Sequence, residues 1–319
     1  MENEIVLTVI LKSNNSDGLN SALGCLCAKQ TEHPIEIRAV VAAGNAAATH
    51  IVSVYQKSNS NFHFQKVKES EVKQAISLET EKALGRYILI ADTRCKFLDT
   101  GVSELINYLS ALNCDVVFFD TLKEAWLFPF ARAKGLSAEF TIEAFLEQNS
   151  RMEFPPEGAA FRKEILQRCI AHSDIFSEEN AVSPLAFCHT GYYAKTTVLR
   201  TVSDTAKSDT LTKIKGARAF IDFFGEVRGL LSDSKYAFLF RYARKKVLSA
   251  YDAYALTGEG REAIENFDAA LRERNLPLYL SAGEHSLLHY VEKLRKNGFR
   301  LTKLQQLASR IQTELKKQF

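Results

Sequence analysis

Asp92 stands directly after an apolar run, where a carboxylate is an unusual choice unless it binds something or turns the chain. Lys12, Ser13 and Asn14 follow an earlier apolar run in the same way. Carboxylate and amide oxygens accept hydrogen bonds from hydroxyl groups, whereas ammonium and amide nitrogens donate hydrogen bonds. These residues could therefore bind a polar ligand that carries hydroxyl groups, although a polar loop at a strand end needs no such role.

The segments around these residues alternate between strand and helix patterns. Short β-branched or apolar runs predict strands at 5–11, 35–41, 62–67, 87–91 and 115–120. Apolar residues at helical spacing predict helices near 19–26, 46–56, 72–84 and 102–109. This alternation predicts a parallel sheet, and ligands of such sheets bind beyond the carboxyl ends of the strands. The segments after Leu11, Val41 and Ala91 should therefore line any site.

In the second half of the chain the apolar residues follow a different spacing. The alternation of strand and helix signals becomes weaker over 122–156. A helix is then predicted at 161–170 and a strand at 192–202. Beyond about Thr210 the apolar positions follow helical spacing and include aromatic residues, as at Phe220, Phe223 and Phe224. We therefore expect an α/β domain at 1–215 and a helical C-terminal module at 216–319.

Composition narrows the partner class and the compartment. A formal net charge of +3 over 319 residues gives no overall attraction to nucleic acid, so no nucleic-acid partner is expected. Six scattered cysteines, the acidic start Met-Glu-Asn-Glu and the lack of an apolar run of about 20 residues favour a cytoplasmic protein. Cys25 and Cys27 lie in an apolar helical pattern, which favours core packing over metal binding.

Several stretches, in the right order and at the right spacing, resemble the family 2 glycosyltransferases of the GT-A fold across about residues 4–215. Residues 7–15 (Leu-Thr-Val-Ile-Leu-Lys-Ser-Asn-Asn) resemble the family's first strand and loop, and residues 24–31, ending in Gln-Thr, resemble its first helix. The most specific match is 83–92, which resembles the lead-in to the family's metal-binding Asp-X-Asp motif. The resemblance implies an α/β, Rossmann-like fold with a mostly parallel mixed sheet flanked by helices.

The chain departs from the family pattern at three places. Residues 42–45 read Ala-Ala-Gly-Asn where the family usually has Asp-Asp-Gly-Ser, and Ile76 falls near the place of an expected Arg. The Asp-X-Asp motif itself reads Asp92-Thr93-Arg94. Arg94 therefore places a cation where Mg²⁺ or Mn²⁺ would bind, which disfavours either ion without excluding it, and no residue is predicted as a metal ligand. A guanidinium pairs bidentately with phosphate oxygens, which would allow metal-independent chemistry.

The resemblance implies a set of roles for the remaining polar residues. Asp92, Arg94, Lys12 and Asn14 are expected to bind a nucleotide-sugar donor, with a UDP-sugar as the first choice. Glu179 stands where the family usually has Glu-Asp and is expected to act as the catalytic base of an inverting transferase, although it also reads as an exposed acid in an acidic loop. The expected acceptor is a cell-surface polysaccharide or glycolipid.

Two alternatives remain open at this point. The three departures also fit a catalytically inactive relative that binds a glycan or serves as a scaffold subunit of a transferase complex. The C-terminal residues 291–319 carry eight Lys or Arg against two Glu, together with an apolar stripe. This basic end could lie on the inner face of a membrane or dock a partner transferase, or it could be a terminal helix with a solvated basic face.

Overall fold

The computed structural model describes residues 4–13, 16, 18–27, 33–93, 101–121, 140–143, 146, 159–170, 186, 189–201 and 209–274. The chain divides into two compact units, Met1–Thr205 and Ala206–Phe319. The predicted domain boundary at 215/216 falls inside the first helix of the second unit, which begins at Thr210. The basic end at 291–319 lies outside the described residues.

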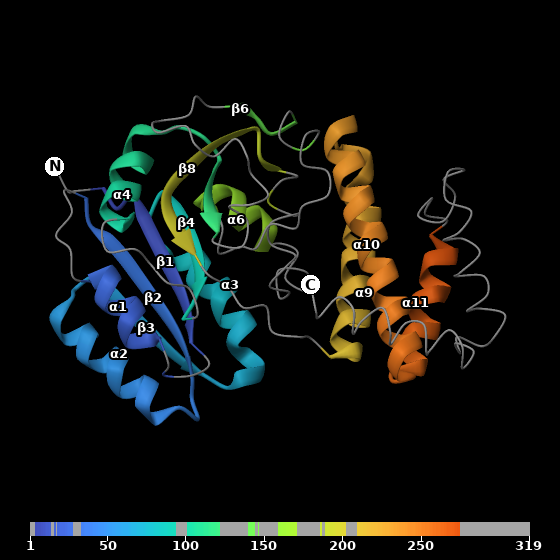
Figure 1. The fold of residues 1–319 in the computed structure, drawn as a ribbon, viewed down its shortest axis with the longest axis horizontal. Helices are drawn as coiled ribbons and strands as arrows, with labels where there is room; N and C mark the ends of the chain where they lie inside the picture. The colour runs from blue at the N-terminus through green and yellow to red at the C-terminus, as the bar shows by residue number, and fades with distance from the viewer. Residues whose placement is uncertain are drawn as a thin grey trace, which may run out of the picture. The chain divides into compact units, whose positions relative to one another are not determined.

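The first unit is built on an eight-stranded sheet with the order β3-β2-β1-β4-β7-β5-β8-β6 (Figure 1). The strands are β1 (Leu7–Ser13), β2 (Ile35–Ala42), β3 (Phe62–Val67), β4 (Tyr87–Asp92), β5 (Val116–Thr121), β6 (Phe140–Thr141), β7 (Ala159–Arg162) and β8 (Tyr192–Thr201). Strands β1 to β4 pair in parallel, as do β5 and β8. Because β7 runs antiparallel to β4 and β5, and β6 to β8, the predicted mostly parallel mixed sheet is confirmed.

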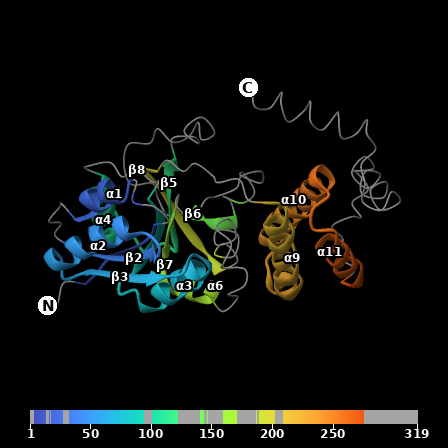
Figure 2. The same cartoon turned by 90° about the horizontal axis from the view of Figure 1, so that it is seen from below.

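Helices cover both faces of this sheet. They are α1 (Leu19–Cys27), α2 (Ala46–Ser58), the short 3₁₀ helix η1 (Glu69–Glu71), α3 (Val72–Lys82), α4 (Gly101–Ala111) and α6 (Lys163–Ile170). Figure 2 shows α1, α2 and α4 on one face and α3 and α6 on the other. The predicted strand–helix alternation over the first 120 residues is confirmed, with boundaries shifted by a few residues at most elements.

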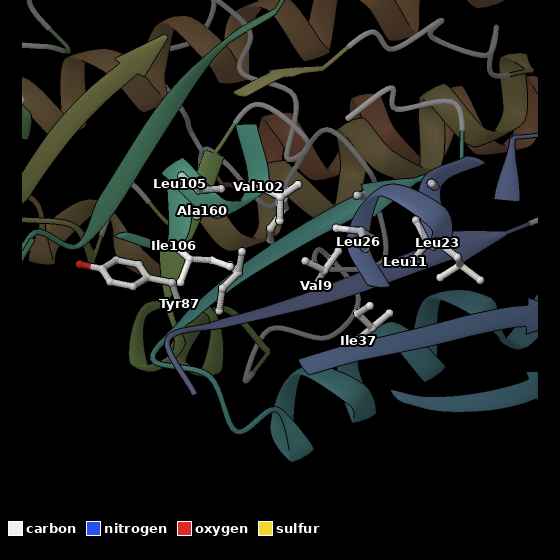
Figure 3. Close-up of a cluster of buried hydrophobic side chains, with 14 of the residues drawn as sticks. Val9, Leu11, Leu23, Leu26, Ile37, Tyr87, Val102, Leu105, Ile106 and Ala160 are labelled. Carbon is white, nitrogen blue, oxygen red and sulfur yellow. The ribbon is translucent and has the colours of Figure 1, made fainter. Parts of the chain in front are cut away.

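The main core lies between the sheet and α1, α2 and α4. Alternate residues of β1 point into it, namely Leu7, Val9 and Leu11, as expected for a strand whose successive side chains face opposite sides of the sheet. Side chains of this core drawn in Figure 3 include Leu23, Leu26, Ile37, Tyr87, Val102, Leu105, Ile106 and Ala160. Cys25 and Cys27 pack against the same core, which confirms their predicted structural role.

The predicted helix at 161–170 is partly wrong, because its first two residues belong to strand β7. The four residues of β7 read Ala-Ala-Phe-Arg, in which only Phe161 favours a strand and no side chain is β-branched. They are extended because β4 and β5 pair with them on both sides. Tertiary pairing therefore overrides the local pattern, and the helix begins at Lys163.

A buried ionic network fixes the edge of the sheet where the parallel strands begin. Glu36 has no exposed surface and accepts hydrogen bonds from Thr8 Oγ1 at 2.6 Å and Arg38 Nε at 2.8 Å. Arg38 Nη1 also donates to Glu79 of α3 at 2.7 Å. The Gly85 amide donates to Thr8 Oγ1 at 2.8 Å, and a Cβ at Gly85 would lie 2.4 Å from Thr8 N. This packing holds the start of β4 against β1.

The second unit is helical where the structure describes it, as predicted. It contains α9 (Thr210–Val227), the 3₁₀ helix η3 (Arg228–Leu230), α10 (Asp233–Thr257) and α11 (Arg261–Glu273). Aromatic contacts join the helices, with Phe220 4.8 Å from Tyr242 and Tyr251 6.0 Å from Phe267 between ring centroids. Gly258 ends α10 with a left-handed φ of 68°, a conformation that glycine adopts without steric strain.

Candidate functional site

The carboxyl ends of β1 and β4 bring two of the predicted site residues together. Lys12 and Asp92 are direct partners in the parallel pairing of these strands. The Thr93 amide donates to the Lys12 carbonyl at 3.1 Å, which extends the pairing one residue beyond Asp92. Asp92 is 8% exposed and Thr93 5% exposed. The sheet therefore presents a largely buried carboxylate beside a lysine at the edge where ligands of parallel sheets bind.

The loop between β1 and α1 returns to this edge at Gly18. Gly18 has a φ of 77°, in the left-handed region that favours glycine. A Cβ at this position would lie 2.4 Å from the carbonyl oxygen of Thr93. The Gly18 carbonyl accepts a hydrogen bond from Ala22 at 2.8 Å and so forms part of the start of α1. The Gly18 backbone thus packs directly on Thr93, the residue that follows Asp92.

The carboxyl end of β2 offers no carboxylate to a ligand, because two alanines begin the turn there. Ala43 is exposed, and its amide donates to the Val67 carbonyl at 2.8 Å. The Asn45 side chain accepts a hydrogen bond from the Ala48 amide at 2.9 Å and caps α2. This turn therefore satisfies its own backbone, and its amide side chain serves the helix.

Ile76, which falls near an expected Arg, has a structural role. It lies on α3 and packs against a small apolar cluster on the second face of the sheet. The cluster consists of Val40, Val67, Val72 and Ala75. An arginine at this position would have to place a charge against apolar side chains, so the departure from the family pattern agrees with the local packing.

Three predicted site residues lie outside the described residues: Asn14, Arg94 and Glu179. Their roles stay predictions. Each belongs to a segment adjoining a described element, because Asn14 follows β1, Arg94 follows Thr93, and Glu179 lies between α6 and β8. The structure thus brings together Lys12 and Asp92, and it gives no positions for the other three.

The described residues around Asp92 do not by themselves form a site for a divalent cation. Mg²⁺ and Mn²⁺ prefer about six oxygen ligands, supplied by carboxylates, carbonyls, water or substrate phosphates. Among the described residues, no three His, Cys, Asp or Glu side chains lie close enough together to hold a metal ion. The buried Asp92 is followed by Thr93 and then by a cationic residue, Arg94. A cation at this edge would need further oxygen ligands from substrate phosphates, from water or from residues outside the described part of the chain.

Comparison with known proteins gives a fold and no family. No protein-family model matches the chain, and no curated protein matches it in sequence. Residues 1–349 of TarS from S. aureus match with a TM-score of 0.64 and 12% identity, over 92% of this chain and 89% of that chain. The same protein in complex with UDP-GlcNAc matches with a TM-score of 0.63 and 14% identity, over 92% and 89% of the two chains. A longer form of TarS is covered over 54% of its length.

Another solved structure matches with a lower TM-score. It is the mannosyltransferase PcManGT from Pyrobaculum calidifontis in complex with GDP-Man and Mn²⁺, with a TM-score of 0.50 and 16% identity, over 89% of this chain and 83% of that chain. These likenesses span both the sheet and the helical residues of this chain. The chain has a GT-A-like fold. At these identities the likeness establishes the arrangement of the GT-A-like fold and no more, so the predicted fold class is confirmed.

Two residues that lie at this edge of the sheet, Gly18 and Thr93, were not among the residues predicted from the sequence. Gly18 and Thr93 meet although they are far apart along the chain. The one sequence signal for Gly18 is its place just before the apolar repeat of a helix, and that signal does not identify Thr93 as the residue it contacts.

Within the segments that the structure covers, no helix combines the length and the apolar character needed to cross a membrane.

Proposed function

We propose that this chain is a glycosyltransferase of the family 2 type that binds a nucleotide-sugar donor, with a UDP-sugar as first choice, at the carboxyl ends of β1 and β4. One observation carries the proposal: Asp92 is buried directly beside Lys12 at the ligand-binding edge of a GT-A-like fold. Solved proteins of similar fold hold UDP-GlcNAc or GDP-Man. The fold and the retained carboxylate support the same ligand class.

In the proposed donor complex, each polar residue binds a different part of the nucleotide sugar. Asp92 accepts a hydrogen bond from a ribose hydroxyl, and Lys12 and Asn14 donate to the nucleoside. Arg94 pairs with the diphosphate and balances its charge in place of a metal ion, because a guanidinium stays protonated and offers two parallel donors. This arrangement would bind the donor without a divalent cation.

The proposed reaction is a single inverting displacement. Glu179 takes the proton of the acceptor hydroxyl while that oxygen attacks the anomeric carbon. The bond from the anomeric carbon to the diphosphate breaks, and its electron pair leaves with the nucleoside diphosphate, whose added negative charge Arg94 stabilises. The proposed acceptor is a cell-surface polysaccharide or glycolipid, reached from the cytoplasmic side of the membrane.

A second candidate function is a catalytically inactive relative that binds a glycan or holds an active transferase. The turn after β2 favours it, because Ala42 and Ala43 offer no side-chain hydrogen bonds and Asn45 is used as a helix cap. Ile76 is likewise packed into a core cluster. In this alternative the GT-A-like fold persists while donor binding is lost.

Donor turnover separates the two candidates. We expect purified protein incubated with a panel of UDP-, GDP- and CDP-sugars and a polysaccharide acceptor to release the nucleoside diphosphate from one donor. Asp92→Ala and Glu179→Gln should each abolish release, with circular dichroism spectra matching those of the wild type. Undiminished release in both variants would overturn the assigned roles, and no release from any donor by the wild type would favour the inactive relative.

The basic end is proposed to serve localisation. Residues 291–319 would hold the protein at an anionic membrane surface or on a partner transferase, since they combine positive charge with an apolar stripe. Co-sedimentation with vesicles containing anionic lipid, compared with vesicles of neutral lipid, tests the membrane contact. Equal sedimentation with both kinds of vesicle would argue against it.

A further inference from the structure

The strand that carries Asp92 is held by close backbone contacts beyond both of its ends. Gly85, just before β4, approaches Thr8 so closely that a Cβ would lie 2.4 Å from Thr8 N. Gly18 approaches Thr93 equally closely beyond the carboxyl end. A contact of this length against backbone atoms leaves no room for a side chain. In both contacts a residue that flanks β4 meets a residue that belongs to β1 or follows it.

We propose that Gly18 is a positioning residue for the donor site, because its missing side chain lets the β1–α1 loop pack on the Thr93 carbonyl. The Thr93 peptide is thereby held from two sides. Its amide donates to the Lys12 carbonyl at 3.1 Å, and its carbonyl oxygen faces Gly18. This packing fixes the direction in which the chain leaves Asp92. The inference rests on the proposed function, in which Asp92 and Arg94 bind the donor on either side of Thr93.

Gly18 cannot easily retreat from this contact, because α1 anchors it. Leu19 and Leu23 of α1 have no exposed surface and belong to the main core. The Gly18 carbonyl is already bonded to the Ala22 amide at 2.8 Å. A methyl group at position 18 would therefore push on Thr93 rather than move the helix, and Thr93 is the residue between the proposed ribose and phosphate ligands. Displacing such a residue by about 1 Å can weaken function as much as a hundredfold.

Two other glycines supply matched controls. Gly258 has a left-handed φ of 68° with no atom within 4 Å of a built Cβ, so Gly258→Ala adds backbone strain without a steric contact. Gly229 lies in η3 of the second unit, also has no atom within 4 Å, and has no positive φ, so Gly229→Ala adds neither backbone strain nor a steric contact. Gly18→Asn keeps the Cβ contact but tolerates the left-handed conformation better than alanine does.

The experiment measures UDP affinity by calorimetry and hydrogen exchange at the Thr93 amide for the full-length wild type and these variants. We expect Gly18→Ala and Gly18→Asn to weaken UDP binding about tenfold or more and to accelerate exchange at Thr93. Gly258→Ala and Gly229→Ala should leave both quantities unchanged. If Gly18→Ala does not fold, Gly18→Asn carries the test.

The outcomes separate the inference from the proposed function. Unchanged UDP affinity in the Gly18 variants of a protein that binds UDP would overturn the inference. A wild type that binds no UDP would contradict the proposed function instead, and the exchange data would then decide on Gly18 alone. In that case, faster exchange at Thr93 supports the positioning contact, whereas unchanged exchange overturns it.

Discussion

At the scale of single residues, a polar side chain near the end of a strand can cap a helix or lie at the edge where ligands of parallel sheets bind. Asp92 ends β4, and Asn45 stands three residues after β2, so each polar side chain lies near the carboxyl end of a strand. In the structure, Asn45 accepts the Ala48 amide and caps α2, whereas Asp92 lies beside Lys12 at the edge between β1 and β4. Only the folded chain distinguishes a capping residue from a candidate ligand-binding residue.

Asn45→Ala tests this distinction. Removing the cap leaves the Ala48 amide without its acceptor, so we expect the free energy of unfolding to fall by about 1 kcal/mol in urea titration. UDP affinity should stay within twofold of the wild-type value, because the side chain is committed to the helix. A loss of affinity well beyond twofold, with stability unchanged, would instead place Asn45 in the donor site.

At the scale of elements, hydrophobic periodicity predicted the bounds of a helix or strand where the element's own residues show clear apolar spacing. The start of α3 and both ends of β3 were predicted to the residue, because clear apolar spacing meets turn residues there. Strand β7 was missed because its four residues are extended only through pairing with β4 and β5. The contact of Gly18 with Thr93 was missed for a related reason, since periodicity carries no information about close approach between distant segments.

Strand β4 also supplies a prediction about alkaline pH. Tyr87 is fully buried, and its hydroxyl donates to the Cys114 carbonyl at 2.8 Å. Burial, which disfavours the charged phenolate, raises the pKa of Tyr87 to about 12. In the unfolded chain a tyrosine ionises near pH 10, so between about pH 10 and 12 only the unfolded state loses this proton. Stability should therefore fall through this window by up to about 3 kcal/mol from this group.

Comparing wild type with Tyr87→Phe isolates that effect from other alkaline titrations. At pH 9 the wild type should be more stable by about 1 kcal/mol, because the variant loses the hydrogen bond to Cys114. As the pH rises to 12 this difference should shrink and change sign, since phenylalanine has no proton to lose. Urea unfolding at several pH values gives the difference directly. A difference that stays constant from pH 9 to 12 would contradict the raised pKa.

At the scale of the whole molecule, the described candidate site and its core belong to one unit. The main apolar core, the ionic network around Glu36 and the Lys12–Asp92 pair all lie within Met1–Thr205. A unit with its own hydrophobic core can in principle fold alone. The sequence indicated a division between an α/β part and a helical part, because the spacing of apolar residues changes near residue 210. Apolar spacing does not mark the first residue of a helix, so the predicted boundary at 215/216 lies inside α9, which begins at Thr210.

A chain truncated after Thr205 should therefore fold and keep the donor site. We expect it to unfold cooperatively in urea and to bind UDP within about threefold of the full-length affinity, since no described site residue is removed. Circular dichroism and calorimetry provide the two readouts. Non-cooperative unfolding of the truncated chain would show that Ala206–Phe319 is needed to complete the first unit.

The central claim is that this GT-A-like fold binds a nucleotide donor at the carboxyl ends of β1 and β4 without a metal. Calorimetric titration of the full-length protein with UDP, GDP and CDP, first in EDTA and then in Mn²⁺, tests it most directly, with Asp92→Ala and Arg94→Ala as site variants. We predict saturable binding in EDTA, little change on adding Mn²⁺, and loss of binding in both variants. No saturable binding in either buffer, or binding that requires Mn²⁺, would contradict the claim.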